Sequence, residues 1–330
     1  MGETNVETLF AWLDDTTKKI QQHRNDTYLE SLTTTLEILF YDDIVDNSMD
    51  DIVKQTLTKS LQQIDLDIYA IHHIRKAVQL AILKGMKGTT QQHHLMTPEA
   101  IALLIGYLVG KLTHKQTKLR IFDPVSGTAN LLTAVMRHLQ KDKQVEAYAN
   151  EIDPTLLKLS LQYANLQKME IEFFHQDSLR PFLLDPVDIV IADLPVGYYP
   201  DDERAQHFQL EAEEGHSYSH HLLMEQSMNY TKSGGYLLFL IPNFLFTSDQ
   251  SDQLQAYLQE HAHIVGLLEL PKTAFKDDSH AKSIFILQKK GEHTSACKQP
   301  LLVQLPSLSN AQAMEDILGQ MNGWFTTNLP

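Results

Sequence analysis

Acidic residues follow short apolar runs at several points in the middle of the chain. Asp123 ends one run, Glu151 follows the run 145–150, and Asp193 follows the run 187–192. Runs of this length that alternate with helical patterns predict buried strands of an α/β sheet. At the carboxyl edge of such a sheet an acidic side chain can accept hydrogen bonds from ribose hydroxyls, and Glu151 is the candidate for that role. The pattern therefore points to a nucleotide-like ligand.

The segment Asp-Pro-Val-Ser-Gly-Thr-Ala-Asn, residues 123–130, predicts a tight turn between a strand and a helix. Amide groups at the N-terminus of such a helix can hold an anionic group, and Gly127 permits close approach of a ligand. The segment lacks the Gly-Lys-Ser/Thr ending of a phosphate loop and the glycine spacing of a dinucleotide site. It is either a ligand site of another kind or an ordinary strand-to-helix turn.

The elements that position these residues fall into successive parts of the chain. From residue 3 to 88 apolar residues recur every three or four positions and glycine and proline are almost absent, which predicts an all-helical N-terminal domain over 1–88. Strand and helix patterns alternate over 89–290, which predicts an α/β domain, and 291–330 form a C-terminal extension with one helix. Thr97 and Pro98 are the expected N-cap and first residue of the helix before the sheet.

Composition limits the classes of function. The 330 residues include 27 Lys and Arg against 42 Asp and Glu, a formal net charge of −15. This sign disfavours a wide grip on a nucleic-acid backbone, so any such role needs a local basic patch or a partner protein. The single cysteine, Cys297, excludes an internal disulfide framework and fits a reducing compartment, and no apolar stretch approaches a membrane span. We expect a cytoplasmic protein that does not associate with membranes.

Paired histidines occur at three places, but their spacing does not fit a metal site. They are expected to be solvated helix or loop residues, with no metal bound, at positions 72–73, 93–94 and 220–221.

In their order along the chain, these motifs resemble those of class I S-adenosylmethionine-dependent methyltransferases. The Asp-Pro-x-x-Gly-Thr turn, the preceding x-x-Thr-Pro segment and the closing strands near 264–288 are similar to those of N6-adenine DNA methyltransferases and of type I restriction modification subunits. The resemblance implies a Rossmann-like domain with a mostly parallel seven-stranded sheet and an antiparallel edge hairpin, with S-adenosylmethionine as cofactor. It also implies a small stand-alone bacterial member without a target-recognition domain.

The resemblance implies a set of cofactor-binding residues, with Glu151 on the ribose and Asp177 against the adenine amino group. The full set is Met96, Thr97, Asp123, Pro124, Gly127, Thr128, Asn130, Leu131, Glu151, Ile152, Asp177, Ser178, Leu179 and Asp193. One glycine of the family turn is replaced by Ala129, whose methyl group is tolerated if its backbone φ is negative.

The sequence Asp-Leu-Pro-Val-Gly-Tyr, residues 193–198, resembles the Asn/Asp/Ser-Pro-Pro-aromatic motif of amino-methylating enzymes. The lone pair of an exocyclic amine is delocalised, and acceptors for its hydrogens favour the geometry that attacks a methyl group. The resemblance implies this role for the Asp193 side chain and the Leu194 carbonyl, in a motif that includes Pro195. The motif departs from the family at Leu194 and Val196, so Tyr198 or its neighbour is expected to supply the stacking ring.

The sequence is compatible with several functions. An adenine in DNA or RNA is the default methyl acceptor, and a protein glutamine or asparagine amide is the alternative within the same class. The departures at Leu194 and Val196, with the acidic segment 201–214, also fit a catalytically degenerate S-adenosylmethionine-binding or interaction protein. The helical domain is a candidate for recruiting a basic partner or for forming an oligomer.

Overall fold

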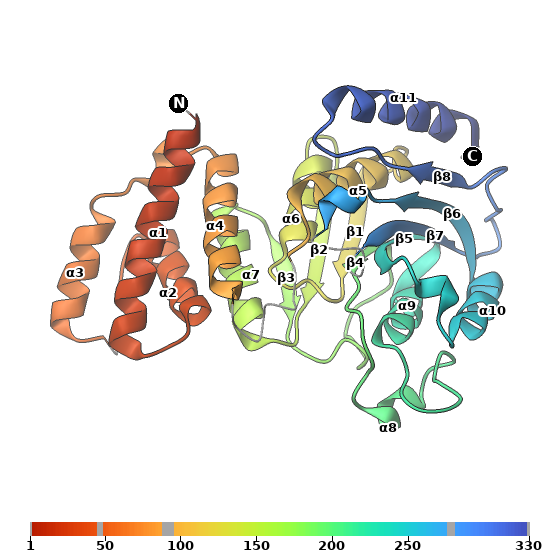
Figure 1. Ribbon diagram of the computed structural model, residues 1–330, viewed down its shortest axis with the longest axis horizontal. Coiled ribbons are helices and arrows are strands. Elements are labelled where there is room, and N and C mark those ends of the chain that lie inside the picture. Colours follow the sequence, from red (N-terminus) through yellow and green to blue (C-terminus); the bar gives the residue numbers. More distant parts are fainter. Residues whose placement is uncertain (1, 45–48, 88–95, 276–280, 329–330) are drawn as a thin grey trace. The chain divides into compact units, whose positions relative to one another are not determined.

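The computed structural model describes residues 2–44, 49–87, 96–275 and 281–328 (Figure 1). The chain divides into two compact units. The first comprises Met1–Met96, Gly127–Ala129 and Asp153–His175, and the second comprises Thr97–Ser126, Asn130–Ile152 and Gln176–Pro330. No helix among the described residues is long and apolar enough to cross a membrane.

The N-terminal part of the first unit is all helical, as predicted from its apolar spacing. Thr27 and Glu30 form a reciprocal capping box that starts the second helix, and Asp50 caps the third. The elements of this unit are α1 (Gly2–Arg24), α2 (Tyr28–Tyr41), α3 (Asp51–Leu61), a 3-10 helix (Leu66–Ile68), α4 (Ile71–Met86), α7 (Pro154–Leu166) and β3 (Ile171–Phe174).

Helix α7 shares the hydrophobic core of the helical region. Leu156, Leu159 and Tyr163 are fully buried there among the apolar side chains of α1, α2 and α4. Arg75 of α4 donates to Gln167 Oε1 at 2.7 Å, and its guanidinium lies 5.6 Å from the centre of the Tyr163 ring. The core of this unit therefore extends beyond residue 88 into a helix from the middle of the chain.

The second unit contains most of the sheet. Its elements are α5 (Glu99–Leu112), β1 (Lys118–Asp123), α6 (Asn130–Leu139), β2 (Gln144–Asn150), β4 (Val187–Asp193), α8 (Asp202–Ala205), α9 (Ser219–Asn229), β5 (Thr231–Pro242), α10 (Ser251–His261), β6 (Ala262–Glu269), β7 (Lys282–Lys289), β8 (Leu301–Gln304) and α11 (Ala311–Asn328).

The strands of this unit lie in the order β2-β1-β4-β5-β7-β6-β8, and β3 is the eighth strand of the sheet. Strands β2, β1, β4 and β5 are parallel, whereas β7 runs antiparallel to both β5 and β6. The mostly parallel α/β sheet and its late antiparallel pairing confirm the predicted fold class. Seven of these strands, including β3, were predicted. The additional strand is β8, which comes from the C-terminal extension and pairs with β6.

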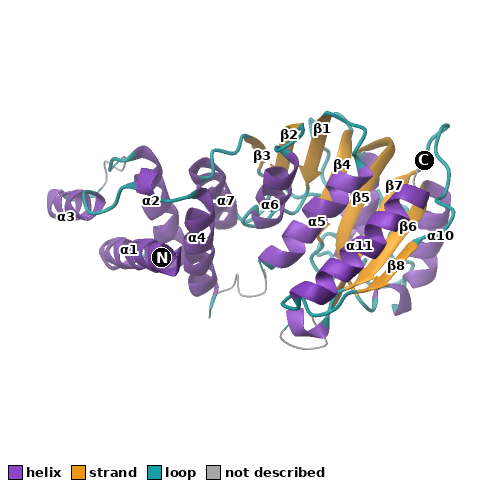
Figure 2. Cartoon of the chain, turned by 90° about the horizontal axis from the view of Figure 1, so that it is seen from above, coloured by secondary structure: helices purple, strands orange, loops and turns teal. Residues whose placement is uncertain are grey.

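Helices cover both faces of this sheet. Figure 1 shows α5 and α11 on one side and α9 and α10 on the other, and Figure 2 shows the strands as one layer. Buried apolar residues from both strands and helices fill the space between the layers. This arrangement explains the near-continuous apolar runs of β4 and β5, because a strand covered on both faces has no solvated side.

The parallel strands bring their last residues to one edge of the sheet. Asp123 ends β1, Asn150 ends β2 and Asp193 ends β4. Because β7 runs the opposite way, its first residue, Lys282, lies at the same edge and pairs with Pro242 at the end of β5. Chemically active side chains from distant parts of the chain therefore meet here.

Candidate active site

Three predicted carboxylates are electrostatically coupled at the carboxyl edge. The Asp123 side chain is only 1% exposed, and its Oδ1 accepts a hydrogen bond from Val125 N at 3.2 Å. Burial raises the pKa of Asp123 well above its usual range, and the nearby carboxylates of Asp193 and Glu151 raise it further. Ionisation of Asp123 is therefore disfavoured by its burial and by its two acidic neighbours.

Asn150, which was not among the predicted site residues, organises the loops beside these carboxylates. Its fully buried amide donates to Pro124 O at 3.2 Å, Gln176 O at 3.0 Å and Ser178 Oγ at 2.9 Å. Its oxygen accepts from Gln176 N at 3.2 Å. Asn150 thus fixes the loop after β1 and the segment that carries Asp177, and the sequence signal was only its place at the end of a strand.

The turn after β1 has an unusual backbone. Gly127 has φ +55°, and a Cβ atom built on it would meet no atom within 4 Å. Ala129 has φ +57°, in the left-handed region that L residues with a Cβ rarely adopt. The condition of a negative φ for accommodating the Ala129 methyl group is therefore not met, and the turn keeps a conformation that suits glycine at this position.

Thr97 has a different role from the predicted helix cap. Helix α5 begins at Glu99, and its N-cap residue, Pro98, makes no side-chain cap bond. The prediction of Thr97 as N-cap is wrong, because its hydroxyl instead donates to Asp193 Oδ2 at 2.8 Å. Asn130 Nδ2 in turn donates to the Thr97 carbonyl at 2.7 Å. These bonds connect the first residue of α6 to the predicted catalytic carboxylate.

Lys282 contacts both of the acceptors that were predicted to hold an amine. Its Nζ donates to Asp193 Oδ1 and lies 3.5 Å from the Leu194 carbonyl oxygen. The lysine and aspartate side chains are 22% and 19% exposed, so solvent reaches the pair only partly. Sequence reasoning missed Lys282 although it predicted the antiparallel hairpin, because no local pattern shows that the first residue of β7 contacts Asp193.

Asp177 is held by donors from within the protein. Its Oδ1 accepts from Leu179 N at 2.9 Å, and its Oδ2 accepts from the Tyr199 hydroxyl. Burial raises the pKa of Tyr199, and the bond to the Asp177 carboxylate raises it further. The Leu179 carbonyl accepts two bonds from the Arg204 guanidinium at 2.8 and 2.7 Å. Arg204, from the acidic segment 201–214, therefore binds the loop that carries Asp177.

The remaining predicted cofactor residues differ in exposure. Ser178 is buried and donates to Pro124 O at 2.6 Å, and Glu151 is buried whereas Ile152 is exposed. The side chains of Thr128 and Leu131 are also buried. Met96 packs against the core of the first unit.

The two tyrosines after the catalytic motif have different surroundings. Tyr198 is 58% exposed, and its ring stacks on Tyr218 with centroids 4.9 Å apart and planes 13° apart. The Tyr218 hydroxyl donates to Asp249 Oδ1 at 3.0 Å, and this bond holds the Tyr218 ring in place beneath Tyr198. Tyr199 is buried and engaged with Asp177, so only Tyr198 presents an aromatic surface to solvent. Val196 is exposed, and Leu194 is fully buried.

One pair of histidines behaves differently from the prediction. His220 and His221 are fully buried, and no hydrogen-bond partner of their ring nitrogens is found among the described residues. The prediction of solvated side chains is wrong for this pair. Burial lowers the pKa of His220 to about 3, with help from the charges of His221 and Lys282, and burial lowers the pKa of His221 to about 4.

The other two histidine pairs differ from His220 and His221 in what the structure shows. His72 is exposed and His73 is half-buried, whereas the pair 93–94 lies outside the described residues. In the described ranges no group of three or more His, Cys, Asp or Glu side chains is arranged to hold a metal ion.

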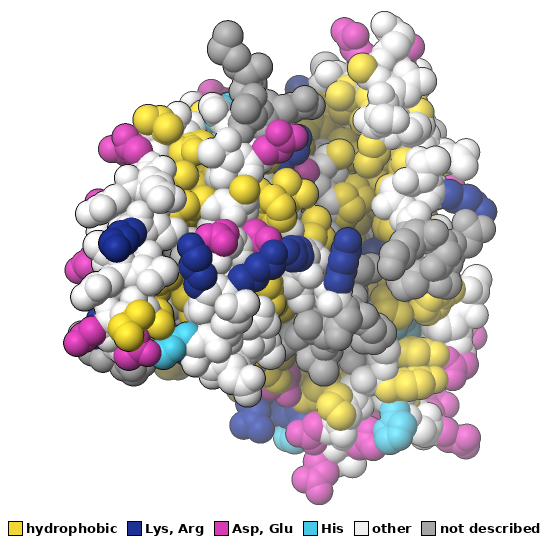
Figure 3. Space-filling model, turned by 60° about the vertical axis from the view of Figure 1, so that its left-hand side comes forward, with side chains coloured by type: hydrophobic (Ala, Val, Ile, Leu, Met, Phe, Trp, Pro, Cys, Tyr) yellow, Lys and Arg dark blue, Asp and Glu magenta, His cyan; other side chains and the backbone are white. Residues whose placement is uncertain are grey.

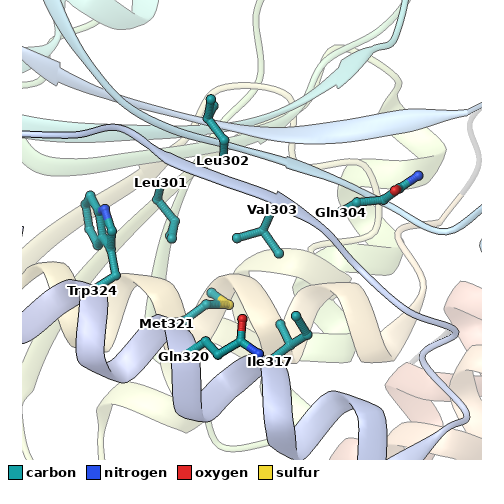
Figure 4. Close-up of a pocket in the computed structure, with 8 residues that line it drawn as sticks. All are labelled: Leu301, Leu302, Val303, Gln304, Ile317, Gln320, Met321 and Trp324. Atoms are coloured by element: carbon teal, nitrogen blue, oxygen red, sulfur yellow. The ribbon is translucent and has the colours of Figure 1, made fainter.

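A separate pocket lies between β8 and α11 and has a volume of about 360 Å³ (Figure 4). Figure 4 shows Leu301 and Val303 of the strand facing Met321 and Ile317 of the helix, with Trp324 at one end. Its lining contains no ionisable side chain. The pocket therefore lacks groups for acid-base chemistry, and none of its lining residues belongs to the predicted site.

Comparisons with known proteins agree with this geometry. Residues 85–320 match the family model described as N-6 DNA Methylase, and residues 7–86 match that of the YtxK N-terminal helical domain. The uncharacterized protein YtxK of Bacillus subtilis is 46% identical over 327 residues, which cover 98% of this chain and 99% of that protein.

Solved structures share the fold. One from Listeria monocytogenes, assigned to the class I S-adenosylmethionine-dependent methyltransferases, is 40% identical, with a TM-score of 0.89 over 98% of this chain and 99% of that one. The methyltransferase subunit of a type I restriction-modification system from Streptococcus thermophilus is 13% identical, with a TM-score of 0.64 over 94% of this chain and 74% of that one. The second likeness concerns the fold alone.

Proposed function

This chain belongs to the N-6 DNA methylase family and is an S-adenosylmethionine-dependent methyltransferase, and we propose that its methyl acceptor is the exocyclic amine of adenine in nucleic acid. The observation that carries the proposal is the place of Asp193 and the Leu194 carbonyl at the carboxyl edge, joined through Thr97 to Asn130 at the start of α6. An amine held by these two acceptors would lie beside the turn proposed to bind the cofactor.

The residues at this edge fit S-adenosylmethionine. The buried carboxyl groups of Asp123 and Glu151 place hydrogen-bond acceptors beside the turn, and Glu151 supplies acceptors for ribose hydroxyls. Open space beside Gly127 leaves room for close approach of a ligand to the turn. We propose that Asp177 accepts from the adenine amino group of the cofactor. When bound, the cofactor supplies a methyl group on a positively charged sulfur.

The acceptor nitrogen then reacts in a single displacement. Asp193 and the Leu194 carbonyl accept its two hydrogens, which favours the pyramidal geometry in which the lone pair is available. S-adenosylmethionine bound beside this subsite would supply its methyl group to the nitrogen lone pair and leave as S-adenosylhomocysteine, and the methylated nitrogen would release one proton to solvent. The protein contributes orientation and electrostatic complementarity, since it needs no covalent intermediate.

The exposed ring of Tyr198 supports an aromatic acceptor. A base that stacks on Tyr198 would extend the ring stack formed with Tyr218. The net charge of −15 argues for help from a partner protein in binding nucleic acid, although Figure 3 shows a face on which Lys and Arg side chains lie among acidic ones. Recruitment or oligomerisation through the helical region and a cytoplasmic location stay predictions.

The test is methyl transfer from labelled S-adenosylmethionine to unmethylated DNA and RNA, compared between the wild type and Asp193→Ala. We expect at least a hundredfold loss of transfer in the variant, with binding of S-adenosylhomocysteine kept within about tenfold, because the loss of preorganised acceptors acts mainly on the transition state. Asp188→Ala is the matched control, since Asp188 lies on the same strand at its other end and pairs with Lys232. Undiminished transfer by Asp193→Ala would reject this mechanism.

The proposed alternative is a catalytically degenerate S-adenosylmethionine-binding protein, which the contact between Lys282 and Asp193 and the departures at Leu194 and Val196 favour. It predicts cofactor binding without transfer to DNA, RNA or protein amides. Methylated product that depends on the protein and disappears in Asp193→Ala would exclude it.

A further inference from the structure

The ammonium group of Lys282 occupies the position in which the proposed mechanism places an acceptor amine. It donates to Asp193 Oδ1 and lies 3.5 Å from the Leu194 carbonyl oxygen. An ammonium and an amino group are both nitrogen donors, so one pair of acceptors cannot bind both fully in the same place. An acceptor can therefore enter only if Lys282 moves aside.

The contact is held in place by its surroundings. Ser283, the next residue, donates to Asn243 Oδ1 at 2.8 Å, and the backbone of Lys282 pairs with Pro242. The other oxygen of Asp193 is engaged by the Thr97 hydroxyl at 2.8 Å. Both oxygens of the carboxylate are thus bonded, and the lysine supplies the only positive charge that the structure places in contact with Asp193 among the described residues.

We propose that Lys282 is a specificity-determining residue of the acceptor subsite, which admits a neutral nitrogen in exchange for the lysine ammonium and excludes an amine that carries its own positive charge. The proposal rests on the proposed function, because it takes Asp193 and the Leu194 carbonyl as the groups that hold the acceptor. A Lys282 side chain that has moved aside still carries its charge close to the Asp193 carboxylate, so a cationic acceptor gains little net attraction and meets repulsion from Lys282. Aromatic amines and amides are neutral at physiological pH, whereas alkylamines such as a lysine side chain are protonated.

An ordinary surface ion pair is the competing explanation for this contact. Exposed ion pairs contribute little to stability and are readily broken. This pair is mostly shielded from solvent. The positive charge of Lys282 also lowers the pKa of the buried His220 ring. The two explanations differ in one measurable respect, which is the response of the subsite to a cationic ligand.

The test compares two ligands that share the adenosine and amino-acid parts of the cofactor. S-adenosylhomocysteine carries a neutral thioether, whereas sinefungin carries a protonated amine where the cofactor has its methyl group. Isothermal titration calorimetry gives the ratio of their dissociation constants for the wild type, Lys282→Met and Lys282→Arg. We expect the preference for sinefungin to rise at least tenfold in Lys282→Met and to stay at the wild-type value in Lys282→Arg.

Lys289→Met is the matched control, because Lys289 lies at the other end of β7 and donates only to backbone carbonyls, of Met228 and Thr231, in the described structure. It should leave the ratio unchanged. The double variant Asp193→Asn with Lys282→Met should lose the gain, because the attraction depends on the Asp193 carboxylate. Lys282→Gln replaces Lys282→Met if the latter does not fold.

The outcomes separate the two proposals. Binding of both ligands with an unchanged ratio in Lys282→Met overturns the role of Lys282 and leaves the cofactor site intact. Failure of the folded wild type to bind either ligand overturns the proposed function itself, and the specificity role with it. A gain for sinefungin that survives in the double variant shows that the cation binds elsewhere and also overturns the role of Lys282.

Discussion

The two halves of the carboxyl edge are built differently. On the cofactor side, polar groups such as Asn150 and Ser178 are buried and bonded to the backbone of the loops that they position. On the acceptor side, Val196 and Tyr198 are exposed, and Lys282 contacts the central carboxylate. The difference suggests that the cofactor side is part of the folded core and cannot change without loss of stability, whereas the acceptor side can change with the substrate.

The largest effect is expected from Asn150, which tests whether the cofactor side is part of the core. Asn150→Ala removes the partners of the Gln176 carbonyl and of the Gln176 amide N–H, whereas the Pro124 carbonyl keeps its bond from Ser178. Each unsatisfied buried group costs about 1–3 kcal/mol, so the free energy of unfolding should fall by about 4 kcal/mol. Urea denaturation measures this loss, and binding of S-adenosylhomocysteine should weaken in parallel.

Asn150→Asp provides a nearly isosteric control, because a carboxylate places an acceptor where the amide donates. It should destabilise the protein at least as much as Asn150→Ala. A loss below about 1 kcal/mol in both variants would mean that the loops are fixed by other contacts, and the contrast between the two halves would fail.

The cofactor side was the more predictable half, for a physical reason. Its residues lie in short local motifs, and a strand followed by a tight turn dictates both the glycine and the helix start. The acidic residues at the strand ends were found in the same way, and Asp153 caps α7 as predicted. Which ligand groups these residues contact stays a prediction.

The acceptor side depends on contacts between distant segments, which local patterns do not contain. Lys282 and Asp193 are 89 positions apart, and Thr97 and Asp193 are 96 apart. A Thr-Pro pair indicates a helix cap when only its neighbours are considered, yet the structure directs the Thr97 hydroxyl to Asp193. The burial of His220 and His221 was missed for the same reason, since two adjacent polar residues give no sign of a helix enclosed on all sides.

These buried histidines make the acceptor side sensitive to acid. Their pKa values of about 3 and about 4 lie below the unfolded value of about 6.5, so the unfolded chain binds more protons as the pH falls below about 6.5. Stability should therefore decrease from pH 7 toward pH 4. One pKa unit corresponds to about 1.4 kcal/mol, and the pair can account for a loss of about 3 kcal/mol between pH 7 and pH 5.

Urea denaturation at both pH values measures this loss in the wild type and in a variant with His220→Gln and His221→Gln. Glutamine does not titrate, so the variant should show a clearly smaller dependence on pH. Equal dependence in the two proteins would mean that other groups cause the acid sensitivity.

A smaller effect is expected from Tyr198, which tests the exposed part of the acceptor side. Stacking of a base on an aromatic ring contributes about 1–3 kcal/mol, so Tyr198→Ala should lower transfer to an adenine-containing oligonucleotide about tenfold. Affinity for S-adenosylhomocysteine should change less than about twofold. Tyr218→Phe is the control, because it keeps the supporting ring and removes only the hydroxyl, with its bonds to Asp249 and to Tyr198. Equal losses of transfer and cofactor affinity in Tyr198→Ala would contradict a role confined to the acceptor.

The smallest effect is expected at Ala129, where the cofactor side departs from its family motif. A left-handed φ costs an L residue about 1–2 kcal/mol, so Ala129→Gly should relieve strain while losing a buried methyl group. Ala134→Gly, in the interior of α6, loses an equally buried methyl group without any such relief and should lower the free energy of unfolding by about 1 kcal/mol or more. Thermal denaturation of the two variants isolates the backbone contribution, and we expect Ala129→Gly to be the more stable by about 1 kcal/mol. Equal stabilities would show that alanine is unstrained in this turn, and that the departure from the family motif has no cost to the fold.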